Sequence, residues 1–193
     1  MTVTVPDPTV TVPLPLREQA DVRARWLTQR VLDVLPELMD RTGIDLWVVL
    51  GREYNEDPVL QTLLPATWLS ARRRTILLFH RSDDGVTAAA VSRYPVGQFE
   101  PAWEADEQPG LTPAQSQWAA VRRFVDQAAP RTIGIDVSAT FAHADGLSHT
   151  EHGLLLEALG PHAADVVSAE PLVVGWLETV SYTHLTLPTN REV

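Results

Sequence analysis

The sequence has no cysteine at any of its 193 positions. Disulfide bonds and thiolate metal sites are therefore excluded. Positive charge is also scarce, because 15 basic residues face 25 acidic ones and leave a net charge of −10. Nucleic acids and anionic membranes are bound through basic surfaces, so this balance argues against either partner. The densest basic run, Arg72-Arg73-Arg74, is interpreted as the solvated start of a strand.

Long apolar runs and a secretory signal are missing as well. No apolar stretch reaches the roughly 20 residues that a membrane-spanning helix needs. The first residues, MTVTVPDPTVTVPLPL, contain neither a basic n-region nor an unbroken apolar segment. We therefore expect a cytoplasmic protein. Residues 1–15 are interpreted as an extended, mobile arm, because their four prolines prevent a helix.

Three common nucleotide-binding and catalytic signatures are also absent. GREYNED follows the apolar run 44–50 and contains one glycine, where a dinucleotide fingerprint or a P-loop needs several. No G-x-S-x-G nucleophile motif occurs in the chain. Nucleotide-dependent enzymes and serine hydrolases of the α/β type thus lose their main sequence support.

Hydrophobic patterning predicts helices that alternate with strands. A helical period begins near Leu16, is interrupted at Pro36 and ends at Gly43. Apolar runs predict strands at 44–50, 75–80, 86–92, 132–137 and 164–169. Further helices are expected after Asp57-Pro58, after Thr112-Pro113 and after a capping-box pattern at residues 148–151. The expected fold class is α/β, with a mixed β-sheet flanked by helices.

Polar side chains at the ends of two predicted strands form the candidate binding site. Arg52, Tyr54 and Asn55 follow the strand at 44–50, and Arg93 and Tyr94 follow the strand at 86–92. Ligands of open α/β sheets bind beyond the carboxyl ends of strands. Guanidinium, phenol and amide groups there suit a carboxylate or a peptide backbone. Packing on neighbouring loops explains the same residues, and both interpretations stay open.

A second cluster, with His143, Asp145, His149 and His152, has the composition of a metal site. His149 falls inside the capping-box pattern at the exposed start of a helix, and His143 and Asp145 fall in a loop. We therefore interpret these side chains as solvated loop and cap residues. The sequence assigns no metal ligand and no catalytic residue.

One long block resembles a known family. LPELMDRTGIDLWVVLGREYNEDPVLQTLLPATWLSARRRTILLF is similar to the amino-terminal domain of bacterial metallopeptidases of the creatinase, prolidase and Xaa-Pro aminopeptidase family. IGIDVSATFAHADGLSHTE and VVSAEPLVVGWLET continue the similarity, which covers residues 16–179. It implies a non-catalytic α/β domain, normally followed by a pita-bread catalytic domain whose Asp, His and Glu side chains bind two divalent metal ions (Mn, Co or Zn).

The resemblance also implies partners. The amino-terminal domain packs on its own catalytic domain and borders the cleft of a second subunit, so a homodimer and a peptide substrate are expected. Two alternatives remain open: a stand-alone domain that binds peptides or proteins, and a fragment of a creatinase-like amidinohydrolase. The resemblance transfers no individual role to the residues of GREYNED.

The last stretch, VSYTHLTLPTNREV at residues 180–193, resembles a translated sequencing adapter. The codons of the transposon mosaic end used in library preparation encode residues 180–189 in order. The adapter bases further on supply a stop after Val193. We therefore interpret residues 180–193 as an artefact without a role in the fold, and we expect the natural protein to diverge near Thr179 and continue into the catalytic domain.

Overall fold

The computed structural model describes residues 14–104 and 110–179. Most of the interpreted arm, residues 1–13, and the whole adapter-like tail, residues 180–193, lie outside these ranges. Pro15 does belong to the described residues, and it directly precedes the first helix as its N-cap. The predicted domain of residues 16–179 therefore begins where a helix begins.

Six strands form one mixed sheet in the order β4-β3-β2-β1-β5-β6. The strands are β1 (Leu46–Arg52), β2 (Arg74–Ser82), β3 (Gly85–Ser92), β4 (Glu100–Pro101), β5 (Ile133–Ile135) and β6 (Val166–Ser168). β1 pairs antiparallel with β2 and parallel with β5, and β2 and β3 form an antiparallel hairpin. The carboxyl ends of β1, β3, β5 and β6 therefore lie along one edge with the start of β2. We call it the carboxyl edge.

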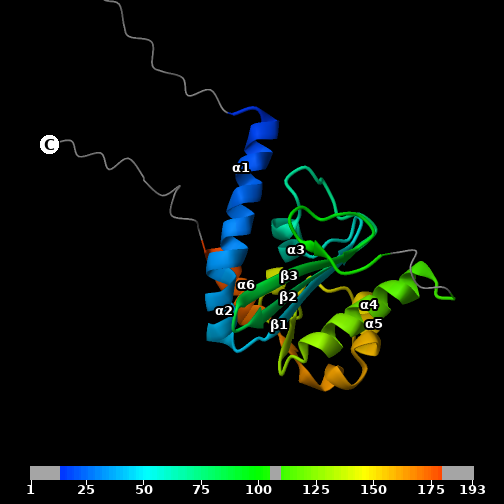
Figure 1. Ribbon diagram of the computed structural model, residues 1–193. Coiled ribbons are helices and arrows are strands. Elements are labelled where there is room, and N and C mark those ends of the chain that lie inside the picture. The colour runs from blue at the N-terminus through cyan, green and yellow to red at the C-terminus, as the bar shows by residue number, and fades with distance from the viewer. Residues whose placement is uncertain (1–13, 105–109, 180–193) are drawn as a thin grey trace, which may run out of the picture.

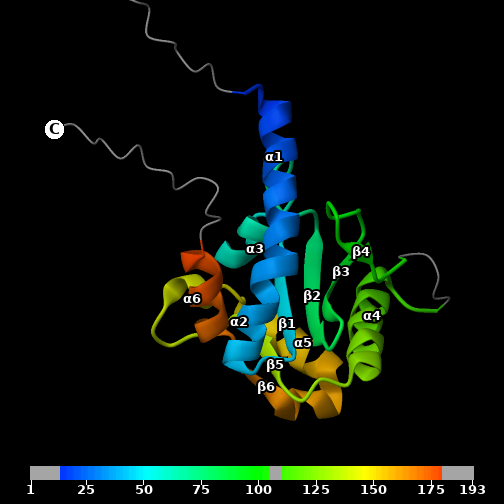
Figure 2. The ribbon, with the colours of Figure 1, turned by 60° about the vertical axis from the view of Figure 1, so that its left-hand side comes forward.

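Helices cover both faces of this sheet (Figures 1 and 2). One face carries α3 (Pro58–Leu63), α6 (Glu170–Glu178) and a continuous rod of α1 (Leu16–Gln29), a π-helical segment (Arg30–Val34) and α2 (Leu35–Thr42). The other face carries α4 (Pro113–Ala128) and α5 (His149–Leu159). Two 3-10 turns, Ala142–Ala144 and Gly160–Asp165, complete the described helices. None of the helices within residues 14–104 and 110–179 has the length and apolarity needed to cross a membrane.

The apolar alternation of β1 divides the core into two halves. Trp47 and Val49 pack under the α1–α2 rod, α3 and α6, whereas Leu46, Val48 and Leu50 pack under α4 and α5. Successive strand residues point to opposite faces, so one nearly continuous apolar run serves both layers. The predicted class, an α/β fold with a mixed sheet flanked by helices, is confirmed.

Trp176 fixes α6 to the sheet. Its ring centroid lies 6.2 Å from that of Trp47, and its indole N–H donates to the hydroxyl of Thr62 at 2.9 Å. The guanidinium of Arg30 stacks on the same ring, with its central carbon 3.8 Å from the centroid. The segment VVGWLET is therefore an integral part of the domain core.

The predicted interruption of the first helix is confirmed, although it begins before Pro36. The π-helical segment Arg30–Val34 widens the helix just upstream, and Pro36 then occupies the first turn of α2. A proline is tolerated there because the first amide groups of a helix need no intrahelical acceptor. Strand β4 was not predicted, because two residues are too short to show an alternating pattern.

Gly43 ends α2 in a left-handed conformation, with φ of 68°. A Cβ added there would meet nothing within 4 Å, so only the backbone opposes a side chain. We expect Gly43→Ala to lower the free energy of unfolding by about 1 kcal/mol, measured by urea denaturation. Gly153→Ala is the matched control, because Gly153 is exposed within α5 and also has open space. This control should stabilise by about 0.5–1 kcal/mol, and equal effects of both changes would contradict the prediction.

Candidate functional site

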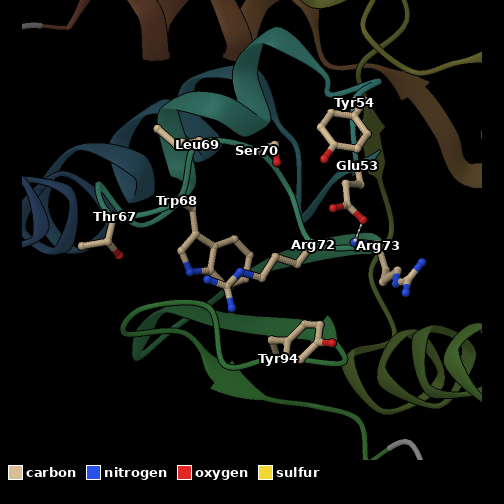
Figure 3. Close-up of a pocket in the computed structure, with 9 residues that line it drawn as sticks. All are labelled: Glu53, Tyr54, Thr67, Trp68, Leu69, Ser70, Arg72, Arg73 and Tyr94. Atoms are coloured by element: carbon tan, nitrogen blue, oxygen red, sulfur yellow. Dashed lines mark hydrogen bonds between the residues drawn. The ribbon is translucent and has the colours of Figure 1, made fainter.

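An open pocket of about 700 Å³ lies at the carboxyl edge (Figure 3). We call it the edge pocket. Three parts of the chain build its wall: the turn after β1, the loop that leads into β2, and Tyr94 after β3. The lining residues are Glu53, Tyr54, Thr67, Trp68, Leu69, Ser70, Arg72, Arg73 and Tyr94. Loops beyond the carboxyl ends of strands are the usual place for ligands in α/β sheets.

Arg72 is held between two aromatic rings of this pocket. Its central guanidinium carbon lies 4.7 Å from the ring centroid of Trp68 and 5.6 Å from that of Tyr94. Figure 3 shows the guanidinium lying over the Trp68 indole, with the Tyr94 ring on the side of β3. Each such contact contributes about 0.5–1 kcal/mol at an exposed site. No acceptor among residues 14–104 and 110–179 binds its N–H groups, so its donors face solvent or a ligand.

The turn at Tyr54 carries an uncommon backbone conformation. Tyr54 and Arg73 both have positive φ, 66° and 58°. The carboxylate of Glu56 accepts from the amides of Tyr54 and Ala71, at 3.1 and 2.8 Å, and the Glu53 amide donates to the Arg73 carbonyl at 2.7 Å. Left-handed backbone costs on the order of 1 kcal/mol or more for residues with a side chain. These hydrogen bonds offset that cost and join the turn to the loop opposite, which leaves the Tyr54 ring 85% exposed at the pocket.

The five candidate binding residues from the sequence do not all line the same pocket. Tyr54 and Tyr94 line the edge pocket. Arg52 is not among its lining residues, and its Nε lies 3.2 Å from the Glu151 carboxylate. Asn55 is exposed and pairs with Arg52 through the backbone. Arg93 lines a neighbouring hollow of about 270 Å³, which shares Arg73 with the edge pocket.

Sequence reasoning did not identify Trp68, Arg72 and Arg73 as part of the site. The available signal was the run ATWLSARRR, an aromatic residue close to three arginines and directly before a strand. The run was interpreted as solvated, and this holds for Arg72 and Arg73, which are exposed. It is wrong for Arg74, whose side chain is only 16% exposed because it is paired with a buried carboxylate.

Glu151 is that buried carboxylate, with a side chain 2% exposed. Nε and Nη2 of Arg74 donate to its two oxygens, at 2.6 and 3.0 Å. The predicted capping box therefore forms only in part: the Ser148 hydroxyl accepts from the Glu151 amide at 3.4 Å, but the Glu151 side chain does not return to Ser148. A bidentate, charge-assisted pair is stronger than a bond to one backbone amide, which explains the departure.

Two further acids are buried together at the carboxyl edge, between the ends of β1 and β5. Asp57 and Asp136 are 1% and 2% exposed. Oδ1 of Asp57 accepts from the amides of Val59 and Leu60 at the start of α3, as the Asp-Pro pattern predicts, and Oδ1 of Asp136 accepts from the Trp47 indole at 2.8 Å. Both Oδ2 atoms are buried without a donor among the described residues. A proton shared between the two side chains would satisfy both atoms.

Burial raises the pKa of both carboxyl groups. Desolvation raises the pKa of Asp57 to about 6, against opposing hydrogen bonds from α3. Burial and the charge of Asp57 raise the pKa of Asp136 well above its usual value. Gly146 closes the pair from outside, since a Cβ on it would lie 2.2 Å from Asp57 Oδ2. The pair is enclosed, so we assign it to the support of the edge and not to ligand binding.

The four residues with the composition of a metal site, which were interpreted as solvated, do not converge. His143 lies against the ring of Phe141, and Asp145 accepts from the Ser138 amide at 3.1 Å. His149 is an exposed residue in the first turn of α5. Within residues 14–104 and 110–179, no group of three or more His, Asp or Glu side chains could hold a metal ion.

Comparison with protein families, with curated proteins and with solved structures finds no match to this chain. The resemblance to the creatinase and prolidase family therefore stays a prediction from the sequence. The geometry of the edge pocket is the firmest basis for a functional proposal.

Proposed function

We propose that residues 16–179 form the non-catalytic amino-terminal domain of a dimetal-dependent peptidase of the Xaa-Pro aminopeptidase or prolidase type, and that the edge pocket binds its peptide substrate. The observation that carries the binding proposal is the position of the pocket: aromatic rings and free guanidinium donors meet at the carboxyl edge of an α/β sheet. The fold class and the sequence resemblance support the placement in a peptidase.

The side chains that line the edge pocket suit the binding of a peptide rather than its hydrolysis. Trp68, Tyr54 and Tyr94 offer flat apolar faces to a peptide side chain or a proline ring. Arg72 and Arg73 offer donors to carbonyl or carboxylate oxygens. We therefore assign these residues to substrate access and orientation, and none to catalysis.

The remaining parts of the proposal follow from the resemblance. The resemblance implies two divalent metal ions, Mn, Co or Zn, bound by a following catalytic domain. The partners would be that catalytic domain and a second subunit of a homodimer. A cytoplasmic location belongs to the same proposal.

Peptide binding without hydrolysis tests this function. We expect Xaa-Pro peptides to bind the purified protein in calorimetric titrations, and Tyr54→Ala to weaken binding about threefold to tenfold through loss of ring contact. Leu32→Ala is the control, because Leu32 is exposed on the π-helical segment and does not line the pocket. No hydrolysis is expected with manganese, cobalt or zinc. Metal-dependent turnover that survives removal of contaminating peptidases would contradict the non-catalytic assignment.

Two alternatives share the same pocket: a stand-alone binding domain and a fragment of a creatinase-like amidinohydrolase. Sequencing the source locus across the Thr179 codon separates the first from a peptidase domain. An in-frame continuation that encodes Asp, His and Glu ligands supports the peptidase, and an immediate stop supports the stand-alone domain. The amidinohydrolase differs only in the substrate pocket of that continuation.

A further inference from the structure

We propose that Arg72 is a carboxylate-binding residue, and that the edge pocket selects peptides by their free C-terminal carboxylate. This inference rests on the proposed peptide-binding function and names the chemistry that the pocket recognises. Three observations carry it: unpaired positive charge, a guanidinium held between two rings, and a volume larger than a single ion requires.

The lining of the edge pocket contains two arginines and one glutamate, although acidic residues outnumber basic ones in the chain as a whole. Three other surface arginines have their charge neutralised by an acid: Arg81 pairs with Asp40, Arg122 with Asp126 and Arg131 with Asp45. The side chains of Arg72 and Arg73, which line the pocket, have no acidic partner among the described residues. Glu53 is the acid nearest in the lining, and its carboxylate faces the Arg73 amide at 3.4 Å. An anion at this place would therefore enter a locally positive region of an acidic protein.

The two rings prepare Arg72 for a planar anion. Stacking on Trp68 and Tyr94 restricts the long side chain, so less conformational freedom is lost when a ligand binds. It also leaves the in-plane N–H groups free, and these match the two oxygens of a carboxylate in a bidentate pair. Arg52 and Arg74 show the opposite case, since both are already paired with Glu151.

The volume of the edge pocket indicates the rest of the ligand. About 700 Å³ falls within the range of small-molecule sites and exceeds what one carboxylate fills. Tyr54 stands across the pocket from Trp68 in Figure 3, so a ligand anchored on Arg72 would extend toward the Tyr54 ring. The C-terminal residue of a peptide has this combination of a carboxylate and an adjacent side chain.

A pair of tripeptides tests the inference. Ala-Pro-Leu with a free carboxylate should bind the 193-residue protein at least tenfold more tightly than the same peptide with a C-terminal amide, measured by calorimetry. Arg72→Gln should remove this difference, and Arg72→Lys should restore only part of it, because lysine keeps the charge without the fork. Arg93→Gln is the matched control: it removes the same charge from an exposed arginine outside the edge-pocket lining and should keep most of the difference.

The outcomes separate the two proposals. Equal binding of acid and amide would overturn the carboxylate site and leave the peptide-binding function standing. Absence of binding by both peptides would overturn the function itself. Equal losses in Arg72→Gln and Arg93→Gln would assign the preference to general charge and contradict the specific role of Arg72. Tighter competition by inorganic phosphate than by acetate would overturn the assignment to carboxylate. Unfolding curves of each variant show whether a loss reflects misfolding.

Discussion

Asparagine in place of Asp136 should raise the free energy of unfolding at about pH 8 by about 2–3 kcal/mol and flatten its dependence on pH. Asp57 and Asp136 are enclosed together, and both Oδ2 atoms lack a donor. An asparagine amide would supply that donor to Asp57, while its carbonyl would still accept from the Trp47 indole. The replacement therefore keeps the hydrogen bond to Trp47 and removes a buried charge.

The sign follows from the group that is replaced: burial and the charge of Asp57 raise the pKa of Asp136 well above its usual value. A group whose pKa is raised in the folded state stabilises that state fully below its unfolded value, and the stabilisation disappears as pH rises through the folded value. Each pKa unit corresponds to about 1.4 kcal/mol of stability. The wild-type protein should therefore lose stability, relative to Asp136→Asn, as pH rises above about 4.

The comparison between variants isolates this pair from other titrating groups. Asp45, Asp126 and Glu170 have lowered pKa values, through hydrogen bonds from Arg131, from Arg122, and from Ser138 and Thr140 respectively. Their stabilising effect is lost as pH falls, the opposite direction, and it is common to both proteins. Asp145→Asn is the control, because it makes the same chemical change on an exposed residue of the neighbouring segment. A less stable Asp136→Asn protein at about pH 8, or parallel pH curves, would contradict the shared proton.

Local patterns predicted the elements of this fold well, because each depends on residues close in sequence. The left-handed Gly43 and the Asp57 cap both occur where propensity places them. The apolar run of β1 also indicated a central, buried strand. The strand and helix signals together fixed the α/β class before any contact was known.

The site depended on contacts between distant segments, which single-sequence patterns do not encode. Glu151 matches a capping box locally, yet Arg74 on β2 reaches it in space and provides a stronger partner. Asp57 is a correct cap, but nothing in its sequence neighbourhood reveals Asp136, which follows the paired strand β5. The local sequence around Arg72 predicts a solvated side chain. Only the pairing of β3 with β2 brings the Tyr94 ring near its guanidinium. The interactions of Glu151, Asp57 and Arg72 are therefore determined by residues distant in sequence, although the helices and strands around them were predicted from local patterns.

Glu151→Ala should lower the free energy of unfolding by about 3–5 kcal/mol, the largest loss that we expect from a single change at this edge. The variant leaves Arg74, 16% exposed, without the two oxygens that it binds, and it also removes the partner of Arg52. An uncompensated, largely buried charge is costly because water cannot replace the lost acceptors. Urea denaturation at neutral pH measures the loss directly.

Glu157→Ala provides the matched control on the same helix. Glu157 is exposed on α5 and its carboxylate has no ion pair or hydrogen bond among the described residues, so its removal should change stability by less than about 0.5 kcal/mol. The double variant Glu151→Leu with Arg74→Leu should recover part of the loss, because it removes both charges and fills the space with apolar atoms. If Glu151→Ala were no more harmful than Glu157→Ala, the Arg74–Glu151 pair would not join α5 to β2. If the double variant were less stable than Glu151→Ala, the pair would matter for its packing and its bonds to Gln117 rather than for its charge balance.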